Sequence, residues 1–491
     1  MRNSRLGSMS LIFLLCLIRA KVPFAQERQL EKEQPFAAAV ALERTLTEIV
    51  ARAEPSVAAI LRVRRNPSDD AAHLDSRPDP FGRRAITPLI PQPTDPDFVP
   101  SQYGAGVIVS PGRILTTADL IGEESDYYVI TNERRVYKAT VWAADPRSYL
   151  AVLSIDATDL PQIVFGDGAR LKKGRIVIAL GNPQSITRDG SPSAACGIVS
   201  NLHRKAPPTP TAFDPTGRFT LHHFGTLIQT DVKLGGNFAG GPLLDLNGEM
   251  VGLCVSFVLA PGQELHGGYA IPVDDVFRRA VETLIEGREV QYGFLGVQPS
   301  DLSEREVLAG MHGIRVAQII PGTPAARFGI KPGDIVTAVD DLPIYDADGL
   351  IFAVSRLPPE STVRLSMFRG GKQQTIAVSL SKLAVRGPKV VSTADPPWRG
   401  LQVEYPTALV DEYGRLPGGL AVLEEAVIVA EVVEGSPAWE AGLRKGMLIT
   451  HVGDTPVGTP SQFAAAAASY TGPVVLQIGG EKPGKLVVNN P

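Results

Sequence analysis

The strongest constraint on the fold is an internal repeat in the second half of the chain. Residues 319–344 read IIPGTPAARFGIKPGDIVTAVDDLPI, and residues 432–457 read VVEGSPAWEAGLRKGMLITHVGDTPV. Each copy has the pattern of a strand, a turn with Ser/Thr-Pro-Ala, a short helix ending at glycine, a second strand and a hairpin. Solenoids need at least about three repeats to bury a continuous core. Two copies therefore predict a tandem pair of small, similar domains.

The first half of the chain has the pattern of a β-rich domain. Between residues 103 and 271, short apolar and β-branched runs alternate with turns, and this spacing predicts a sandwich or a barrel. The 48 glycines and 41 prolines among 491 residues fit such a turn-rich fold. Residues 56–65 predict a further strand, and the spacing of apolar residues predicts helices over 36–52 and 272–287. Residues 66–101 are rich in proline and predict a long loop.

The N-terminus has the features of a secretory signal peptide, which we predict to cover residues 1–25. A basic start precedes an apolar run at Ser10–Ile18, and Ala25 is a small residue near which cleavage is expected. The apolar run is far shorter than the ~20 residues that span a bilayer, so we expect no integral membrane segment after signal removal. These features predict an exported protein, located in the periplasm of a double-membrane bacterium.

Composition argues against nucleic acid as a partner and against a metal site. The formal net charge is −4, and the basic residues form no stripe along the sequence. The three cysteines, Cys16, Cys196 and Cys254, lack metal-ligand spacing, and the sequence has neither a phosphate-binding loop nor an HExxH motif. Cys196 and Cys254 could form one disulfide, although buried free thiols are the favoured interpretation. We therefore expect no cofactor.

The repeated segments resemble PDZ domains. Such domains bind an extended peptide as an added strand and receive its terminal carboxylate on the backbone N–H groups of a loop. In the first copy, YGFLGV at 292–297 resembles this loop, and residues 346–357 resemble the helix beside the peptide groove. The resemblance implies peptide binding by Phe294, Leu295, Gly296 and Val297.

The second copy departs further from the PDZ pattern. RGLQV at 399–403 and residues 459–470 take the places of the loop and the helix. Residues 404–425 look inserted, and Gln402 stands where a glycine is usual, so the implied ligand binding is less secure. The implied peptide contacts are Leu401, Gln402 and Val403.

A β-rich first half followed by two PDZ-like modules resembles the HtrA/DegP family of trypsin-like serine proteases over residues 36–485. Residues 103–121 and 145–156 resemble the stretches that carry the catalytic histidine and aspartate, and residues 228–253 resemble the nucleophile loop. The implied fold is mainly β, with a trypsin-like double six-stranded β-barrel followed by two PDZ domains of α+β type. The implied boundaries are 36–288 for the protease-homology domain, 291–384 for the first PDZ domain, 385–397 for a linker and 398–485 for the second PDZ domain.

The resemblance also assigns the three triad positions, and none of them keeps its catalytic residue. Asp119 occupies the histidine position, Tyr149 the aspartate position and Ala239 the serine position. Chymotrypsin-type proteolysis needs a serine hydroxyl, a histidine to take its proton and a carboxylate to orient the imidazole. Alanine has no nucleophile, and an aspartate with a pKa of about 3.9 is a weak base at neutral pH. The oxyanion loop would comprise Asn237, Phe238 and Ala239, and its N–H groups could still bind a carbonyl oxygen.

The sequence therefore predicts a proteolytically inactive homologue that binds unfolded polypeptides or protein C-termini through its PDZ domains, in envelope protein quality control or scaffolding. Two alternatives stay open: an active serine endopeptidase with an atypical catalytic constellation, and a structural envelope protein in which the barrels are a spacer. His222 and His223 are expected at the surface of a polar loop. The resemblance also implies a homotrimer or a mixed oligomer with active family members, with residues 26–55 as the contact.

Overall fold

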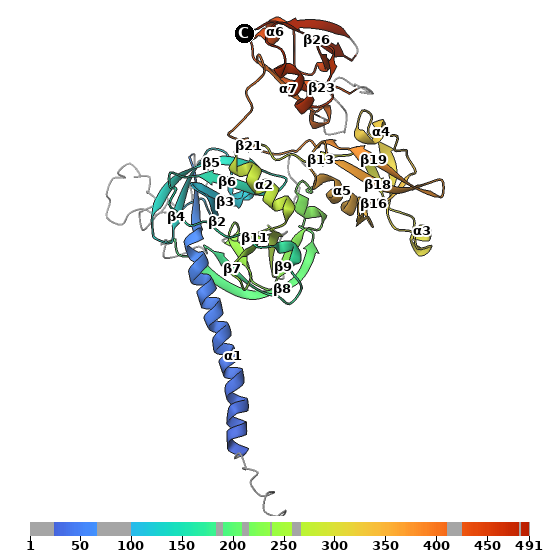
Figure 1. The fold of residues 1–491 in the computed structure, drawn as a ribbon. Coiled ribbons are helices and arrows are strands. Elements are labelled where there is room, and N and C mark those ends of the chain that lie inside the picture. Colours follow the sequence, from blue (N-terminus) through green and yellow to red (C-terminus); the bar gives the residue numbers. More distant parts are fainter. Residues whose placement is uncertain are drawn as a thin grey trace, which may run out of the picture.

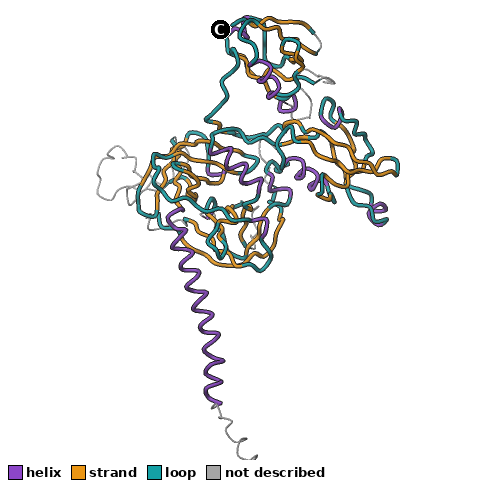
Figure 2. The backbone as a smooth tube through the Cα atoms, viewed as in Figure 1, coloured by secondary structure: helices purple, strands orange, loops and turns teal. Residues whose placement is uncertain are grey.

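The computed structural model of the protein is built mostly of strands, with its helices at the periphery (Figure 2). The predicted signal peptide lies almost entirely outside the described residues, and so does most of the predicted loop at 66–101. For residues 24–35 the backbone alone is described. The described ranges are 24–65, 100–182, 190–208, 216–235, 238–257, 267–409, 425–480 and 483–490.

Six antiparallel strands close the first barrel, in the order β5-β4-β1-β2-β3-β6 with β6 pairing back to β5. Alternate side chains point inward, and Ile60, Ile114 and Leu153 are fully buried in its core. Burial of this kind stabilises a fold by roughly 1.5–3 kcal/mol per large apolar side chain. The strands are β1 (Val57–Arg64), β2 (Gln102–Ser110), β3 (Arg113–Thr117), β4 (Ser125–Thr131), β5 (Val136–Asp145) and β6 (Leu150–Ser154).

The second barrel is also closed by six strands, in the order β10-β11-β12-β9-β8-β7. The predicted double six-stranded barrel is therefore confirmed (Figure 1). Leu180, Leu227 and Leu253 fill the space between the barrels in one continuous cluster with residues of the first barrel. The strands are β7 (Ile176–Gly181), β8 (Ser193–Arg204), β9 (Leu227–Thr230), β10 (Pro242–Leu244), β11 (Met250–Val255) and β12 (Gly268–Pro272).

Helix α2 (Asp275–Ile285) follows the second barrel and packs against β5 and β6 of the first. The Asp274 side chain caps its first turn by accepting a hydrogen bond of 2.9 Å from the Phe277 N–H. Phe277, Val281 and Leu284 recur at helical spacing and are buried in the shared core. The amphipathic helix predicted for this segment is thus present and fixes the end of the barrel domain.

The repeat forms two domains with the same strand order, as predicted. Their main sheets run β14-β15-β16-β18-β19 and β22-β23-β24-β26-β27, with β17 and β25 as matching hairpin strands. The first contains β13 (Gly293–Phe294), β14 (Val297–Ser300), α3 (Glu304–Leu308), β15 (Ile314–Ile319), α4 (Pro324–Arg327), β16 (Ile335–Val339), β17 (Leu342–Pro343), α5 (Ala347–Ser355), β18 (Thr362–Arg369), β19 (Lys372–Ser379) and β20 (Ser381–Lys382). The second contains β22 (Leu401–Glu404), β23 (Val427–Val432), α6 (Pro437–Glu440), β24 (Leu448–Val452), β25 (Thr455–Pro456), α7 (Pro460–Ala468), β26 (Val474–Gly479) and β27 (Gly484–Val488).

The segment between these domains does not cross open solvent. Its strand β21 (Val390–Val391) pairs antiparallel with β5 of the first barrel and adds a strand to that sheet (Figure 1). Nearby, the buried Lys382 amine donates to Glu289 at 2.8 Å and to Glu404 at 2.5 Å. These contacts join the barrel domain, the first small domain and the second.

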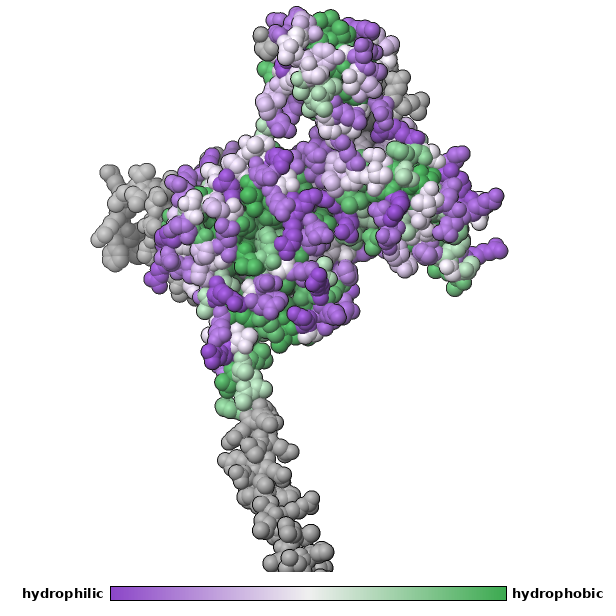
Figure 3. All heavy atoms as spheres, in the orientation of Figure 1, coloured by the Kyte–Doolittle hydropathy of each residue, from purple (hydrophilic) through white to green (hydrophobic). Residues whose placement is uncertain are grey.

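Helix α1 (Phe24–Ala53) begins far from the barrels and ends against them (Figure 1). Near its end, Ile49 is buried in the shared core. Farther out, apolar side chains on this helix are exposed and show as a hydrophobic patch just above the undescribed side chains (Figure 3). These are Phe36, Val40 and Leu42. No helix among the described residues combines the length and apolar character needed to span a bilayer.

The two cysteines within the described residues are both free. Cys254 is buried in β11, and burial raises the pKa of its thiol to about 12. Cys196 is exposed on β8, so the expectation of two buried thiols holds for Cys254 alone.

Candidate functional site

Two of the predicted triad positions meet at the cleft between the barrels. Asp119 lies in the short helix η3 (Ala118–Leu120) directly after β3, and Tyr149 directly precedes β6. Strands β3 and β6 pair, and the Ala118 N–H donates to the Tyr149 carbonyl at 3.0 Å. The Tyr149 hydroxyl and the Asp119 carboxyl group are close enough for each to influence the pKa of the other. The ladder between the two strands therefore brings these side chains together.

The surroundings of this pair keep both groups toward their neutral forms. Asp119 remains accessible through the cleft, but protein replaces most of the bulk water around it, and this desolvation raises the pKa of its carboxyl group. Hydrogen bonds from Thr117 and Tyr149 partly offset the rise. Burial and the neighbouring Asp119 raise the pKa of Tyr149, so its phenol stays protonated and acts as a donor. Tyr149 also has a φ of 63°, an uncommon conformation for a bulky residue.

The third predicted position, Ala239, is buried in the second barrel where its backbone meets β2 of the first. Its carbonyl oxygen accepts a 2.9 Å hydrogen bond from the Ala105 N–H of β2. The neighbouring Phe238 packs against the core cluster of the second barrel. Asn237, the remaining residue of the predicted oxyanion loop, lies outside the described residues. The oxyanion hole therefore stays a prediction.

The expectation that His222 and His223 are surface residues is wrong, because each is only 4% exposed. His222 bonds through Nδ1 to the Thr226 hydroxyl at 2.8 Å and through Nε2 to the Ser148 carbonyl at 2.9 Å. His223 Nδ1 bonds to the Thr220 hydroxyl at 2.8 Å, and its Nε2 lies 3.2 Å from the Pro207 carbonyl.

These partners define a structural role for the histidine pair. Thr220 and His223 form the capping box of the short helix η5 (Leu221–Phe224), and the spacing of these two residues is the signal that sequence reasoning missed. Burial lowers the pKa of both imidazoles, that of His222 to about 4, which keeps them uncharged at neutral pH. Among the described residues, no group of three His, Cys, Asp or Glu side chains could hold a metal ion.

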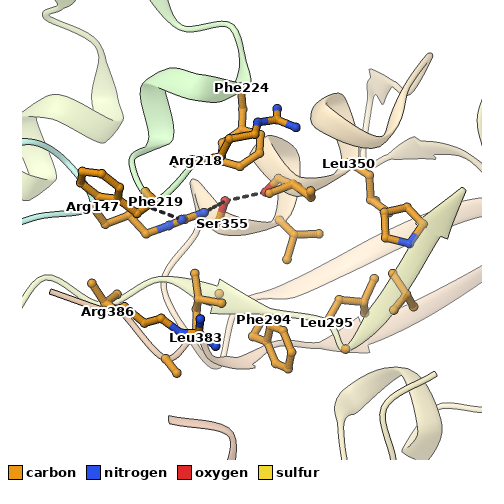
Figure 4. Close-up of a pocket in the computed structure, with 18 residues that line it drawn as sticks. Arg147, Arg218, Phe219, Phe224, Phe294, Leu295, Leu350, Ser355, Leu383 and Arg386 are labelled. Atoms are coloured by element: carbon orange, nitrogen blue, oxygen red, sulfur yellow. Dashed lines mark hydrogen bonds between the residues drawn. The ribbon is translucent and has the colours of Figure 1, made fainter. Parts of the chain in front are cut away.

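The peptide-binding residues predicted in the first PDZ domain line one groove of about 380 Å³. In Figure 4, Phe294 and Leu295 lie on one side of this groove and Leu350 of α5 lies on the other. Val354 and Leu383 add further apolar lining. The predicted loop and the predicted helix thus form its two walls.

The loop of the first PDZ domain also has the backbone that a carboxylate would need. Within the described residues, the N–H groups of Leu295 and Gly296 have no hydrogen-bond acceptor. Gly296 has a φ of 88°, and a Cβ at this position would lie 2.1 Å from the Thr323 hydroxyl oxygen. Only glycine fits this turn, which leaves the two donors at the groove.

The barrel domain contributes side chains to the same groove, which sequence reasoning missed. Arg147 donates to the Ser355 hydroxyl of α5 at 3.2 Å, and Figure 4 shows its side chain reaching across to that helix. Arg218 pairs with Asp348 at 2.6 Å, and Lys205 pairs with the same carboxylate at 2.5 Å. Both arginines line the groove, so it is a composite of two domains.

The second PDZ domain has a different loop register from the predicted one. Val297 pairs with Ile319 in the first domain, and Leu401 pairs with Val432 in the second. Gly400, with a φ of 81° and Ser436 beside it, therefore corresponds to Gly296, and Gln402 lies two residues farther along the strand. The missed signal was the Ser/Thr-Pro-Ala turn that faces this glycine in both copies.

The predicted contacts of the second domain lie near another cavity. Leu401 is 2% exposed and belongs to the core of this domain. Gln402 and Val403 line a cavity of about 520 Å³ that also takes in Lys382 and Glu289 from the preceding domains. The structure therefore does not bring the three residues together in one groove of the second domain.

Comparison with known proteins gives matches along both halves of the chain. Residues 104–253 match the family described as trypsin-like peptidase domain, and residues 293–380 and 428–478 match families described as PDZ domain. A probable periplasmic serine endoprotease DegP-like from Marinomonas sp. (strain MWYL1) is 30% identical over 375 residues, covering 75% of this chain and 74% of that protein. The periplasmic pH-dependent serine endoprotease DegQ of Escherichia coli (strain K12) is 29% identical over 383 residues, covering 76% of this chain and 77% of DegQ.

A solved structure supports the fold. The HtrA-type protease AlgW with tripeptide aligns with a TM-score of 0.51 at 24% identity, covering 70% of this chain and 97% of that one. The fold of the aligned 70% of this chain is therefore shared with that structure.

Proposed function

Since this chain belongs to the HtrA/DegP family of trypsin-like periplasmic endoproteases with PDZ domains, we propose that it is a member that binds polypeptides without cleaving them. It would capture unfolded chains or protein C-termini in the first PDZ groove and act in envelope protein quality control or scaffolding. The observation that carries the proposal is the pairing of Asp119 with Tyr149 where the family has its histidine and aspartate. Ala239 supplies no hydroxyl to activate at the serine position.

The chemistry of the cleft supports this proposal. Burial keeps the Tyr149 phenol protonated, so it cannot stabilise an imidazolium as a carboxylate would, and Ala239 offers no hydroxyl for a base to activate. An active endopeptidase with an atypical constellation would need another base near another hydroxyl. His223 does lie beside a hydroxyl in the cleft, because its Nδ1 is 2.8 Å from the Thr220 hydroxyl. This contact belongs to the capping box of η5, and the other ring nitrogen faces the Pro207 carbonyl rather than a carboxylate that could orient an imidazolium.

The location follows from the family. The relatives are named periplasmic endoproteases, and the predicted periplasmic location of this chain agrees with them. The signal peptide and the cleavage site near Ala25 stay predictions. Assembly into a homotrimer or a mixed oligomer with active members is part of the proposal, and the exposed apolar residues of α1 support it.

The absence of an activated serine can be tested with a fluorophosphonate probe. We expect the mature protein to remain unlabelled at concentrations that label Escherichia coli DegQ completely, because the probe reacts with a serine whose proton is removed by a base. Labelling is read by in-gel fluorescence and by the mass of the intact protein. A stoichiometric adduct on any serine of the native protein would contradict the proposal, and heat-denatured protein serves as the control for non-specific reaction.

Peptide capture can be tested with pairs of peptides that differ at one group. We expect a peptide with a free C-terminus to bind the full-length protein at least about tenfold more tightly than its C-terminal amide, because a charge-assisted hydrogen bond contributes about 1.5–3 kcal/mol. Fluorescence anisotropy gives both dissociation constants. Equal affinity of the two forms would exclude carboxylate recognition. A second assay measures whether the protein suppresses the aggregation of a reduced client protein. Suppression would support a chaperone-like role, and no effect would support that of a spacer.

A further inference from the structure

A second cavity, of about 560 Å³, is lined by Asp119 and Tyr149, two of the predicted triad positions. This volume is in the range of small-molecule sites, which combine apolar walls with a few convergent polar groups. The walls come from the first barrel, from the loop before η5 and from the end of β11. Pro388 and Val390 of the interdomain segment contribute a further side. The cavity is therefore shaped by parts of the chain that are far apart in sequence.

Aromatic rings make up much of the lining. Tyr149, Phe219 and Phe257 all line the cavity. Tyr149 and Phe257 have their ring centroids 6.3 Å apart, and Phe257 packs in turn edge-on against Tyr269 at 5.9 Å. These contacts hold the rings in place. Aromatic faces carry negative electrostatic potential and attract cations placed over them.

The charged groups of the lining have one sign. Asp119 lies within the cavity and Glu123 is exposed beside it, whereas the described lining includes no lysine and no arginine. His223 is the other titratable group of the lining besides Tyr149. Its Nδ1 accepts a 3.2 Å hydrogen bond from the Thr220 N–H, as an uncharged imidazole does, and burial lowers its pKa. The Arg62 guanidinium lies beside Gly122 of the lining, and it donates to Ser125 and Gln102. The lining itself thus offers carboxyl groups and aromatic faces without a lysine or arginine among them.

We propose that this cavity binds an organic cation, an ammonium or guanidinium group on an apolar stem, with the charge at Asp119 and the stem against the rings of Tyr149 and Phe257. Charge complementarity selects the cation over a neutral or anionic molecule of the same shape. The stem replaces water against the apolar walls. The inference goes beyond the proposed function, because binding at this cavity depends neither on peptide capture by the PDZ domains nor on a chemical reaction.

The direct test compares three molecules of the same shape. Isothermal titration of the full-length protein with 2-phenylethylamine, 2-phenylethanol and phenylacetate should show binding of the amine at least tenfold tighter than that of the other two. Asp119→Asn, which keeps the shape and removes the charge, should lower the affinity for the amine at least tenfold. Asp301→Asn, at an exposed carboxylate of the first PDZ domain, is the matched control and should change nothing. Equal binding of the three molecules, or full binding by Asp119→Asn, would overturn the proposal.

The dependence on pH gives an independent readout. Binding of the amine, which stays protonated up to about pH 9, should strengthen as pH rises and Asp119 ionises. The other titratable groups of the lining are Tyr149, Glu123 and His223, and the Arg62 guanidinium lies beside Gly122. Asp119→Asn separates their contribution because it should remove the pH dependence. A profile that Asp119→Asn leaves unchanged would assign the effect to another group and overturn the proposal.

The cation could be a free amine or a basic side chain of a polypeptide, and a second pair of ligands distinguishes them. Blocked peptides with an internal arginine or with norleucine in its place are titrated as C-terminal amides, so that the carboxylate site of the PDZ groove is not engaged. Tighter binding of the arginine peptide, lost in Asp119→Asn, identifies a polypeptide ligand. Binding of 2-phenylethylamine without this difference identifies a free amine. Both outcomes support the cation site, and failure of both ligands overturns it while leaving the PDZ experiment untouched.

Discussion

Casein cleavage should appear when the three departures at the cleft are reversed together in the variant Asp119→His, Tyr149→Asp, Ala239→Ser. Loss of a complete triad lowers the rate of proteolysis about 10⁶-fold. If the triple variant regains only one thousandth of this rate enhancement, its turnover should still exceed that of the parent protein about 10³-fold. The backbone favours the change at position 149, because a φ of 63° suits aspartate better than tyrosine. Cleavage is measured by the release of fluorescent fragments from labelled casein.

The matched control retains the alanine. The double variant Asp119→His, Tyr149→Asp has the base and its orienting carboxylate but no nucleophile, and it should remain inert. Activity in the parent protein would overturn the proposal of a non-cleaving member. A triple variant that melts like the parent and yet stays inactive would contradict the assignment of these three positions to the triad.

Replacing Gly296 by alanine should remove peptide binding at the first PDZ domain. The new Cβ would approach the Thr323 side chain to 2.1 Å, and a non-glycine residue at a φ of 88° costs a further ~1–2 kcal/mol. The loop must shift to relieve both effects, which moves its N–H donors away from the carboxylate. We expect the affinity for a free C-terminal peptide to fall at least about tenfold, the equivalent of 1.4 kcal/mol.

Gly310→Ala is the control that separates the contact from the backbone strain. Gly310 has a similar φ of 83°, but a Cβ there would meet nothing within 4 Å. Both variants should therefore lose some stability, measured by thermal unfolding, and Gly296→Ala alone should lose peptide affinity, measured by fluorescence anisotropy. Unchanged affinity in Gly296→Ala would show that the peptide is bound elsewhere.

The fold could be predicted from the sequence because its signals are local. The repeat of 319–344 in 432–457 specified two similar domains, since Ser/Thr-Pro-Ala turns and glycine-terminated helices are set by neighbouring residues. The strand runs of the first half specified a β-rich domain for the same reason. The double barrel itself came from resemblance, because periodicity does not distinguish a barrel from a sandwich.

The site could be predicted only in part, because its other features depend on contacts between distant segments. Arg147 lines the groove of a domain that begins well over a hundred residues later, and nothing around it in the sequence indicates this. His222 and His223 appeared to lie on a polar loop, yet tertiary packing buries them. The alignment of Gln402 with a loop glycine failed for a different reason: strand pairing rather than letter matching shows that Gly400 takes that place.

The short strand β21 limits how far the second PDZ domain can move from the barrels. It is held to the first barrel by the pairing of Val390 with Ala144 and of Val391 with Ala143, supported by Ser392 on Trp142. A pulling force on a bound polypeptide would separate β21 from β5 once the Lys382–Glu404 ion pair between the two PDZ domains is broken. The freed stretch 383–397 could then span at most roughly 50 Å, at about 3.3–3.6 Å per residue. Under tension, the stretch 383–397 would therefore extend before either PDZ domain unfolded.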